Sequence, residues 1–139
     1  MKAREVMTSN VECVSPDIGI FDIARKMKSL DVGFIPVCDN DRLVGTITDR
    51  DIVIRGIAEG LDLDSTKARE LMTSDVFYCF EDDNVEDVAH KMQEKEVRRM
   101  LILNRSKRLV GVVSIGDLSQ ARGQEQLVGG TTRDITEAA

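Results

Sequence analysis

The sequence predicts an α/β protein made of two tandem repeats, each with the order strand, helix, strand, strand, helix. The first observation is an internal repeat: the segment KAREVMTS at residues 2–9 returns as KARELMTS at residues 67–74, and RLVG at residues 42–45 returns at residues 108–111. The second is that matching strand and helix patterns follow in the same order in both copies. We therefore predict repeat 1 at residues 1–64 and repeat 2 at residues 65–121.

Each repeat begins its predicted fold with a short apolar run that is typical of a strand, Val11–Val14 in repeat 1 and Val76–Cys79 in repeat 2. In repeat 1, Ser15-Pro16 then predicts a helix start with an N-cap and a first-turn proline. In repeat 2, Asp83 with Glu86 matches a capping box.

The helices that follow are predicted to be amphipathic. Their apolar residues fall at positions 20, 23, 24 and 27 in repeat 1 and at 85, 88, 89 and 92 in repeat 2. This spacing predicts one buried face on each helix. Met27 and Met92 hold matching positions on that face and are therefore expected in the core.

Two further strands and a second helix complete each repeat. Apolar runs at 34–38 and 43–48, and at 99–103 and 109–114, are separated by polar turns and predict a β-hairpin in each repeat. The second helix is expected from about Asp49 to Glu59, where Gly60 is a stop signal, and its counterpart starts near Ile115. Residues 122–139 have little apolar content, which predicts a flexible C-terminal tail.

One repeat alone would bury too little apolar surface to be stable. We therefore expect the two repeats to pack on each other about a pseudo-twofold axis, with equivalent clefts between them.

The composition excludes several classes of protein. The chain has 139 residues, of which 42% are hydrophobic and 32% charged, with a formal net charge of −6. That charge argues against nucleic acid as a partner, because phosphate contacts need clustered Lys and Arg. No apolar run is long enough for a membrane span, and three cysteines do not make a disulfide framework. We expect a cytoplasmic protein that does not bind membranes.

The candidate binding residues are Thr48 with Asp51 and Ser114 with Asp117, each pair lying where a strand ends and a helix begins. A helix N-terminus suits a phosphate, a hydroxyl can bond a phosphate oxygen, and a carboxylate one turn on can accept both hydroxyls of a ribose. The same pattern is also a capping box, in which both side chains satisfy only the helix's own N–H groups. The pattern by itself leaves both interpretations open.

These segments carry a family resemblance. The RLVG signature, with GTITDRDI at residues 45–52 and GVVSIGDL at 111–118, resembles the cystathionine-β-synthase (CBS) domain, and the tandem pair over residues 2–120 resembles a Bateman module. The run TDRDIVIRG at 48–56 is similar to small stand-alone bacterial members.

The resemblance implies a non-enzymatic regulatory module that binds AMP, ADP, ATP or a related adenosyl ligand in its clefts. It also implies a homodimer. Because no effector domain is evident in the sequence, we expect the module to act in trans on an unidentified protein partner. Within each motif, the hydroxyl residue would meet phosphate and the aspartate would meet the ribose.

Arg98-Arg99 opens the second strand of repeat 2, where repeat 1 has Gly33-Phe34. Members of the family often carry a basic residue here that meets the phosphate, so the resemblance implies unequal sites, one with a cation and one without. The alternative is that the two arginines are merely solvated at a strand edge.

Cys13 and Cys38 lie at or near the ends of two predicted strands of repeat 1. If those strands are parallel neighbours, the pair can meet the Cα separation of about 4.4–6.8 Å that a disulfide needs. Alternatively, both are buried reduced thiols. The pair supports an alternative function, a structural or redox-responsive interaction protein with vestigial ligand clefts.

The sequence predicts no catalytic residue and no metal site. It has no P-loop, no G-x-G-x-x-G motif, no nucleophile–base pair and no metal-ligand cluster. His90, the single histidine, lies beside the apolar face of its helix and is expected to be exposed.

Overall fold

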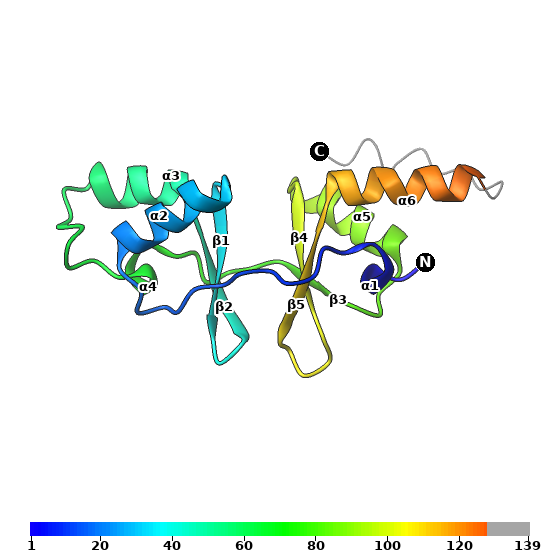
Figure 1. Ribbon diagram of the computed structural model, residues 1–139, viewed down its shortest axis with the longest axis horizontal. Helices are drawn as coiled ribbons and strands as arrows, with labels where there is room; N and C mark the ends of the chain where they lie inside the picture. Colours follow the sequence, from blue (N-terminus) through cyan, green and yellow to red (C-terminus); the bar gives the residue numbers. More distant parts are fainter. Residues whose placement is uncertain (128–139) are drawn as a thin grey trace. The chain divides into compact units, whose positions relative to one another are not determined.

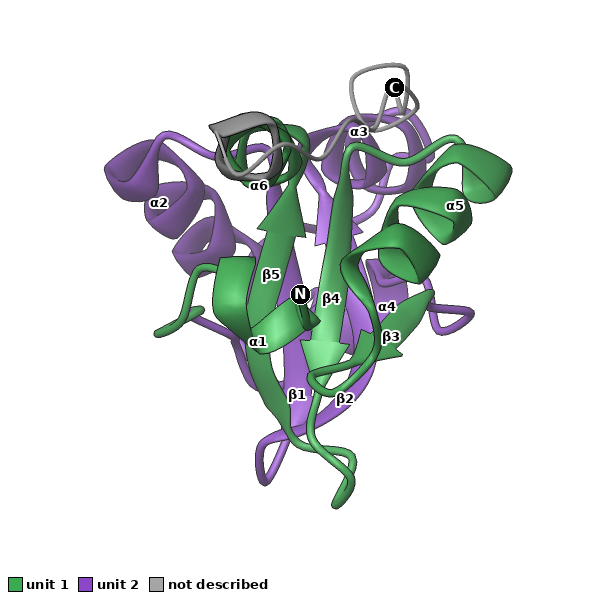
Figure 2. Ribbon diagram, turned by 90° about the vertical axis from the view of Figure 1, so that its right-hand side faces the viewer, with its two compact units in different colours: residues 1–11, 77–139 green, residues 12–76 purple. Residues whose placement is uncertain are grey.

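The computed structural model describes residues 1–127, which form two compact units. Unit 1 combines residues 1–11 with the chain from Phe77 onward, and unit 2 contains residues 12–76 (Figure 2). The KAREVMTS segment of repeat 1 therefore belongs to unit 1, and the matching segment of repeat 2 belongs to unit 2. The sequence repeat and the compact unit are thus different divisions of the chain.

Unit 2 is built on a β-hairpin. Strands β1 (Phe34–Asp39) and β2 (Arg42–Thr48) pair antiparallel (Figure 1). Asn40 and Asp41, which connect them, both have positive φ, as a two-residue hairpin turn requires. Single bridges extend the sheet on both sides, because Val14 pairs parallel with Val37 and Thr73 pairs antiparallel with Thr46.

Unit 1 repeats this arrangement. Strands β3 (Tyr78–Phe80) and β4 (Arg99–Leu103) are parallel, and β4 pairs antiparallel with β5 (Leu109–Ser114). Thr8 forms a bridge with Val112 of β5. The predicted hairpins and the parallel neighbour of each are confirmed, although residues 11–13 of the first predicted strand form no ladder.

The crossover helices α2 (Ile20–Leu30) and α5 (Val85–Lys95) have the predicted buried face. Both end at a residue in the left-handed conformation, Asp31 and Glu96. Met27 and Met92 lie in the two cores, as predicted, but Ala24 is exposed whereas its counterpart Ala89 is buried. The buried residues of these helices are Ile20, Ile23 and Met27 in α2 and Val85, Val88, Ala89 and Met92 in α5.

The predicted starts of these helices are wrong. Helix α2 begins at Ile20 rather than after Ser15, because the Pro16 and Ile18 carbonyls accept hydrogen bonds from Arg69 N and Ala68 N. Those bonds hold the segment outside the helix, and residues 16 and 17 form a turn closed by the bond from Ile18 N to Ser15 O at 3.1 Å. Asp83 does not cap α5, since its carboxylate accepts the backbone N–H of Phe80 at 2.8 Å.

Two short helices, α1 (Ala3–Val6) and α4 (Ala68–Leu71), lie in the KAREVMTS and KARELMTS segments. Each of these segments begins one repeat but belongs to the unit that contains most of the other repeat, and we call them the exchanged segments. The second helix of repeat 1 is divided into α3 (Asp49–Asp51) and the π-helix η1 (Ile52–Ile57). The bond from Ala58 N to Val53 O, at 2.9 Å, has the i to i−5 spacing of a π-helix. Gly60 follows with a φ of 72°, as expected for a stop signal.

Helix α6 (Ile115–Leu127) extends beyond its predicted end. It includes residues 122–127, which were predicted to belong to the flexible tail. The stretch QARGQEQL at 120–127 contains no proline and several good helix formers, so the helix can continue despite its low apolar content. The rest of the predicted tail, 128–139, lies outside the described residues. Within residues 1–127, no helix is both long and apolar enough to cross a membrane.

Candidate functional site

Thr48 and Asp51 form a complete capping box at the start of α3. Thr48 Oγ1 accepts the Asp51 N–H at 3.0 Å, and Asp51 Oδ2 accepts the Thr48 N–H at 2.9 Å. Strand β2 brings Thr48 to this position in an extended conformation, so the chain turns from strand to helix at a residue whose side chain satisfies one of the first helical N–H groups, that of Asp51.

Ser114 and Asp117 repeat this geometry in unit 1, where β5 ends and α6 begins. Ser114 Oγ accepts the Asp117 N–H at 3.1 Å, and Asp117 Oδ2 accepts the Ser114 N–H at 2.9 Å. All four side chains of the two motifs are half-buried. The capping interpretation of both motifs is therefore confirmed.

The cap leaves part of each motif available for a ligand. Among residues 1–127, neither Asp51 Oδ1 nor Asp117 Oδ1 accepts a hydrogen bond. The Thr48 and Ser114 hydroxyls act as acceptors in the cap, so each can still donate its own O–H. Capping and ligand binding are thus compatible, and the cap holds the carboxylate and the hydroxyl in a fixed position.

Arg99 lies beside Ser114. The two residues are direct partners in the antiparallel pairing of β4 and β5, so their side chains share one face of the sheet. Arg98 lies one residue outside the strand, and its carbonyl accepts the Ile115 N–H at 3.3 Å. Both arginines are exposed, and neither guanidinium has a hydrogen bond or ion pair with another described residue. The geometry therefore favours Arg99 as the cation next to Ser114.

In unit 2 the strand position that corresponds to Arg99 has no cation, and an acid lies beside it. Phe34 is the partner of Thr48, and a Cβ added to Gly33 would lie only 2.7 Å from Asp49 Oδ2. The Asp49 carboxylate therefore covers the position from which a side chain at residue 33 would start. Its counterpart in unit 1 is the uncharged Ile115. The two motifs thus share a cap but differ in the charge beside it.

Two glycines allow the exchanged segments to pack against the strands that carry the motifs. A Cβ on Gly45 would lie 2.7 Å from Met72 Sδ and 2.9 Å from Thr73 O. A Cβ on Gly111 would meet Met7 and Thr8 O in the same way, the latter at 3.0 Å. In the sequence these glycines are part of the RLVG signature, and no close contact was predicted for them. The signal that could have predicted it is a glycine within a strand, repeated in both copies.

Gly56 also permits a close contact, which the sequence could not assign. A Cβ there would lie 3.2 Å from Leu71 Cδ1 and 3.3 Å from Leu63 Cδ2, both within unit 2. The neighbouring Arg55 donates to the carbonyls of Leu71 and Met72, at 3.0 and 3.3 Å. Helix η1 and the end of α4 therefore support each other.

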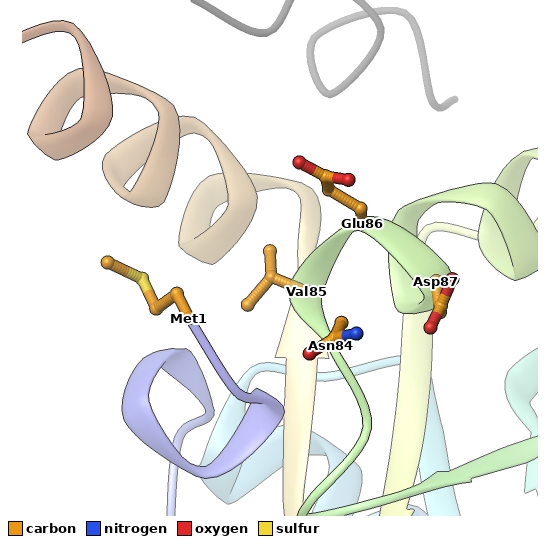
Figure 3. Close-up of a pocket in the computed structure, with 5 residues that line it drawn as sticks. All are labelled: Met1, Asn84, Val85, Glu86 and Asp87. Carbon is orange, nitrogen blue, oxygen red and sulfur yellow. The ribbon is translucent and has the colours of Figure 1, made fainter. Parts of the chain in front are cut away.

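A shallow pocket in unit 1 contains none of the six predicted site residues. It is lined by Met1, Asn84, Val85, Glu86 and Asp87 at the start of α5 (Figure 3). Glu86 and Asp87 make this lining acidic, which disfavours a phosphate.

The described residues do not by themselves fit a zinc site. No group of three or more His, Cys, Asp or Glu side chains among residues 1–127 could hold a metal ion, whereas a structural zinc site needs four ligands. His90 is exposed, as expected. Cys13, Cys38 and Cys79 are free thiols.

Comparison with known proteins identifies the family. The CBS domain model matches residues 3–56 and 68–123. The chain belongs to the CBS-domain family. Its two matched segments correspond to the two sequence repeats and include Thr48 with Asp51 and Ser114 with Asp117.

Several relatives are similar to this CBS pair over nearly their whole length. Hypoxic response protein 1 of Mycobacterium tuberculosis is 35% identical over 127 residues, covering 91% of this chain and 88% of the relative. A crystal structure of hypoxic response protein I with two coordinated zinc ions has a TM-score of 0.79 and 36% identity, covering 87% of this chain and 98% of that one. The predicted resemblance to stand-alone CBS pairs is therefore confirmed.

Two more distant structures share the fold and contain adenosyl ligands. CBSX2 in complex with AMP has a TM-score of 0.77 and 24% identity, covering 90% of this chain and 98% of that one. The CBS pair of MJ0100, in complex with 5′-methylthioadenosine and S-adenosyl-L-methionine, has a TM-score of 0.72 and 24% identity, covering 87% and 98%.

Proposed function

We propose that this CBS pair is a non-enzymatic regulatory module that binds an adenine nucleotide or a related adenosyl ligand. The observation that carries the proposal is the open Asp Oδ1 and hydroxyl O–H left by each capping box in a chain of the CBS family. In this proposal the aspartate accepts the ribose hydroxyls, and Thr48 or Ser114 donates to a phosphate oxygen.

The two motifs are proposed to differ in the ligand that they favour. Arg99 lies next to Ser114 on the same face of the sheet, so this motif suits a ligand with a phosphate, such as AMP, ADP or ATP. The Thr48 motif has Phe34 and Asp49 instead. A carboxylate repels phosphate, so this motif suits an adenosyl ligand without one.

Regulation requires that the ligand change an equilibrium. A ligand that binds two conformations equally shifts neither, so the proposed signal depends on a difference in affinity between two states of the module. The output would act on a protein partner in trans. The homodimer, the partner and the cytoplasmic location are further parts of this proposal.

Titration calorimetry of the full chain with AMP, ADP, ATP, NADH and S-adenosylmethionine tests the proposal. Asp51→Asn and Asp117→Asn are the informative variants, because an amide oxygen can still accept the capping N–H while the charged acceptor for the ribose is lost. We expect saturable binding of at least one ligand, weakened about 10-fold or more by one of the two variants, since a hydrogen bond to a charged group contributes about 1.5–3 kcal/mol.

An unchanged melting temperature in the two Asn variants is the control that their caps are intact. Saturable binding that neither variant weakens would reject the assigned residues. No binding of any of the five ligands would leave both motifs as helix caps and contradict the proposed function.

A further inference from the structure

Two cysteines of unit 2 are diagonal neighbours on one face of its sheet. The Val14–Val37 bridge fixes the register, with Cys38 N donating to Val14 O at 2.9 Å and Val14 N donating to Pro36 O at 3.0 Å. Side chains alternate along a strand, so Cys13, which precedes Val14, and Cys38, which follows Val37, share the opposite face at diagonal positions. The Cys13 thiol is near enough to that of Cys38 to contribute to its raised pKa.

The two thiols differ in access. Cys38 is only 6% exposed, whereas Cys13 is half-buried and reaches solvent. Burial, and then the neighbouring Cys13 thiol, raises the pKa of the Cys38 thiol. An external reagent therefore meets Cys13 first, and Cys38 is positioned behind it.

Repeat 2 does not share this pair. Tyr78 and Leu103 take the positions of Cys13 and Cys38. Cys79 takes the position of Val14 and is buried in the core of unit 1, where burial raises its pKa to about 11. The cysteine pair is therefore a feature of unit 2 and not a requirement of the fold.

We propose that Cys13 and Cys38 form a reversible disulfide when the protein meets a low-molecular-weight disulfide such as oxidised glutathione. The Cys13 thiolate attacks one sulfur of the external disulfide, forms a mixed disulfide and releases the first external thiolate. The Cys38 sulfur then attacks Cys13 Sγ and releases the second. The two protons of the cysteine thiols pass to the two released thiolates, so two cysteines are oxidised and one external disulfide is reduced to two thiols.

The bond would cross-link the chain where it enters unit 2. Cys13 lies directly after Glu12, the first residue of that unit, and Cys38 lies in β1. The closed loop contains all of α2, so the bond would restrict the unfolded chain. We expect the oxidised protein to melt roughly 5–10 °C above the reduced protein. This inference does not depend on the proposed nucleotide binding.

In the test, the reduced full chain is incubated with excess oxidised glutathione. It is then unfolded in a denaturant that contains N-ethylmaleimide, which alkylates the remaining thiols, and the intact mass and the cross-linked peptides are measured. The reduced protein has three cysteines to alkylate. After oxidation we expect alkylation at Cys79 alone, a peptide linking Cys13 to Cys38, and reversal by dithiothreitol. The Cys79→Ser variant is the matched control and should form the same bond.

The Cys38→Ser variant tests the order of attack. It should accumulate a glutathione adduct on Cys13, whereas Cys13→Ser should leave Cys38 largely unmodified. Alkylation of all three cysteines after oxidation of the native chain would overturn the proposal. So would a persistent adduct on Cys13 in the native chain, or a bond that involves Cys79.

Discussion

The start of β1 in unit 2 is equivalent to the start of β4 in unit 1. The two positions differ in the charge that lies beside the capping box. In unit 1, Arg99 pairs with Ser114, whereas in unit 2 the partner of Thr48 is Phe34, with the Asp49 carboxylate close by. The hydrogen bonds of the two capping boxes have nearly the same lengths.

The difference separates what the fold needs from what a ligand would need. A cap satisfies backbone N–H groups in any helix, so both repeats keep it. The charged residues beside the motif do not take part in the cap, so they can differ between the two repeats. The charged neighbours, more than the shared motif, should therefore decide which ligand each motif accepts.

Removing Arg99 should have the largest effect on this comparison. Arg99→Gln removes a charge-assisted contact with phosphate, and we expect affinity for a phosphate-bearing nucleotide to fall about 10- to 100-fold. The matched change in unit 2, Phe34→Leu, should leave that affinity within about twofold, because no charge is lost. Calorimetry with AMP measures both. Equal losses in the two variants would show that the charge beside the cap does not distinguish the motifs.

The two strand glycines should behave alike. Gly45→Ala and Gly111→Ala each place a methyl group within about 3 Å of a backbone carbonyl, that of Thr73 or Thr8. Such overpacking costs about 2 kcal/mol. Urea unfolding should show similar losses of stability for both variants. A cost confined to one variant would mean that the two exchanged segments are not equivalently packed.

The two units also differ in the ion pair formed by one equivalent aspartate, and we expect a smaller effect on stability from this difference. Asp17 in unit 2 bonds Arg69 of α4 at 3.0 Å, whereas Asp82 in unit 1 bonds Arg105 of the hairpin turn at 3.1 Å. In each case the hydrogen bond from the guanidinium lowers the pKa of the aspartate below 3.8. Asp17→Asn and Asp82→Asn therefore test the same charge in two settings.

The sign follows from the lowered pKa. The folded state binds the proton less tightly than the unfolded chain, so each pair stabilises the protein above about pH 4 and loses this effect as the pH falls through the folded-state pKa. Asp17 and both guanidinium groups are exposed and Asp82 is half-buried, so the effect is small. We expect each variant to melt slightly below the native chain at pH 7 and equally at pH 2, measured by circular dichroism. A difference that persists at pH 2 would point to packing rather than charge.

The sequence alone determined the order of elements and the local chemistry of the motifs. The period-3.6 pattern predicted the buried face with Met27 and Met92, and the spacing of Thr48 with Asp51 predicted a cap. These features depend on residues three or four apart, which interact within one helix turn or one strand end. Local patterns are sufficient for them.

The tertiary structure decided the features that depend on distant partners. Helix α2 starts at Ile20 because Pro16 bonds Arg69, far along the chain. The pairing of Arg99 with Ser114 on one sheet face, like that of Cys13 with Cys38, depends on strand register. A backbone carbonyl accepts whichever donor the fold brings to it, and a register shifted by one residue would turn each side chain to the other face. The spacing of neighbouring residues in the sequence predicts neither the long-range hydrogen bond nor the strand register.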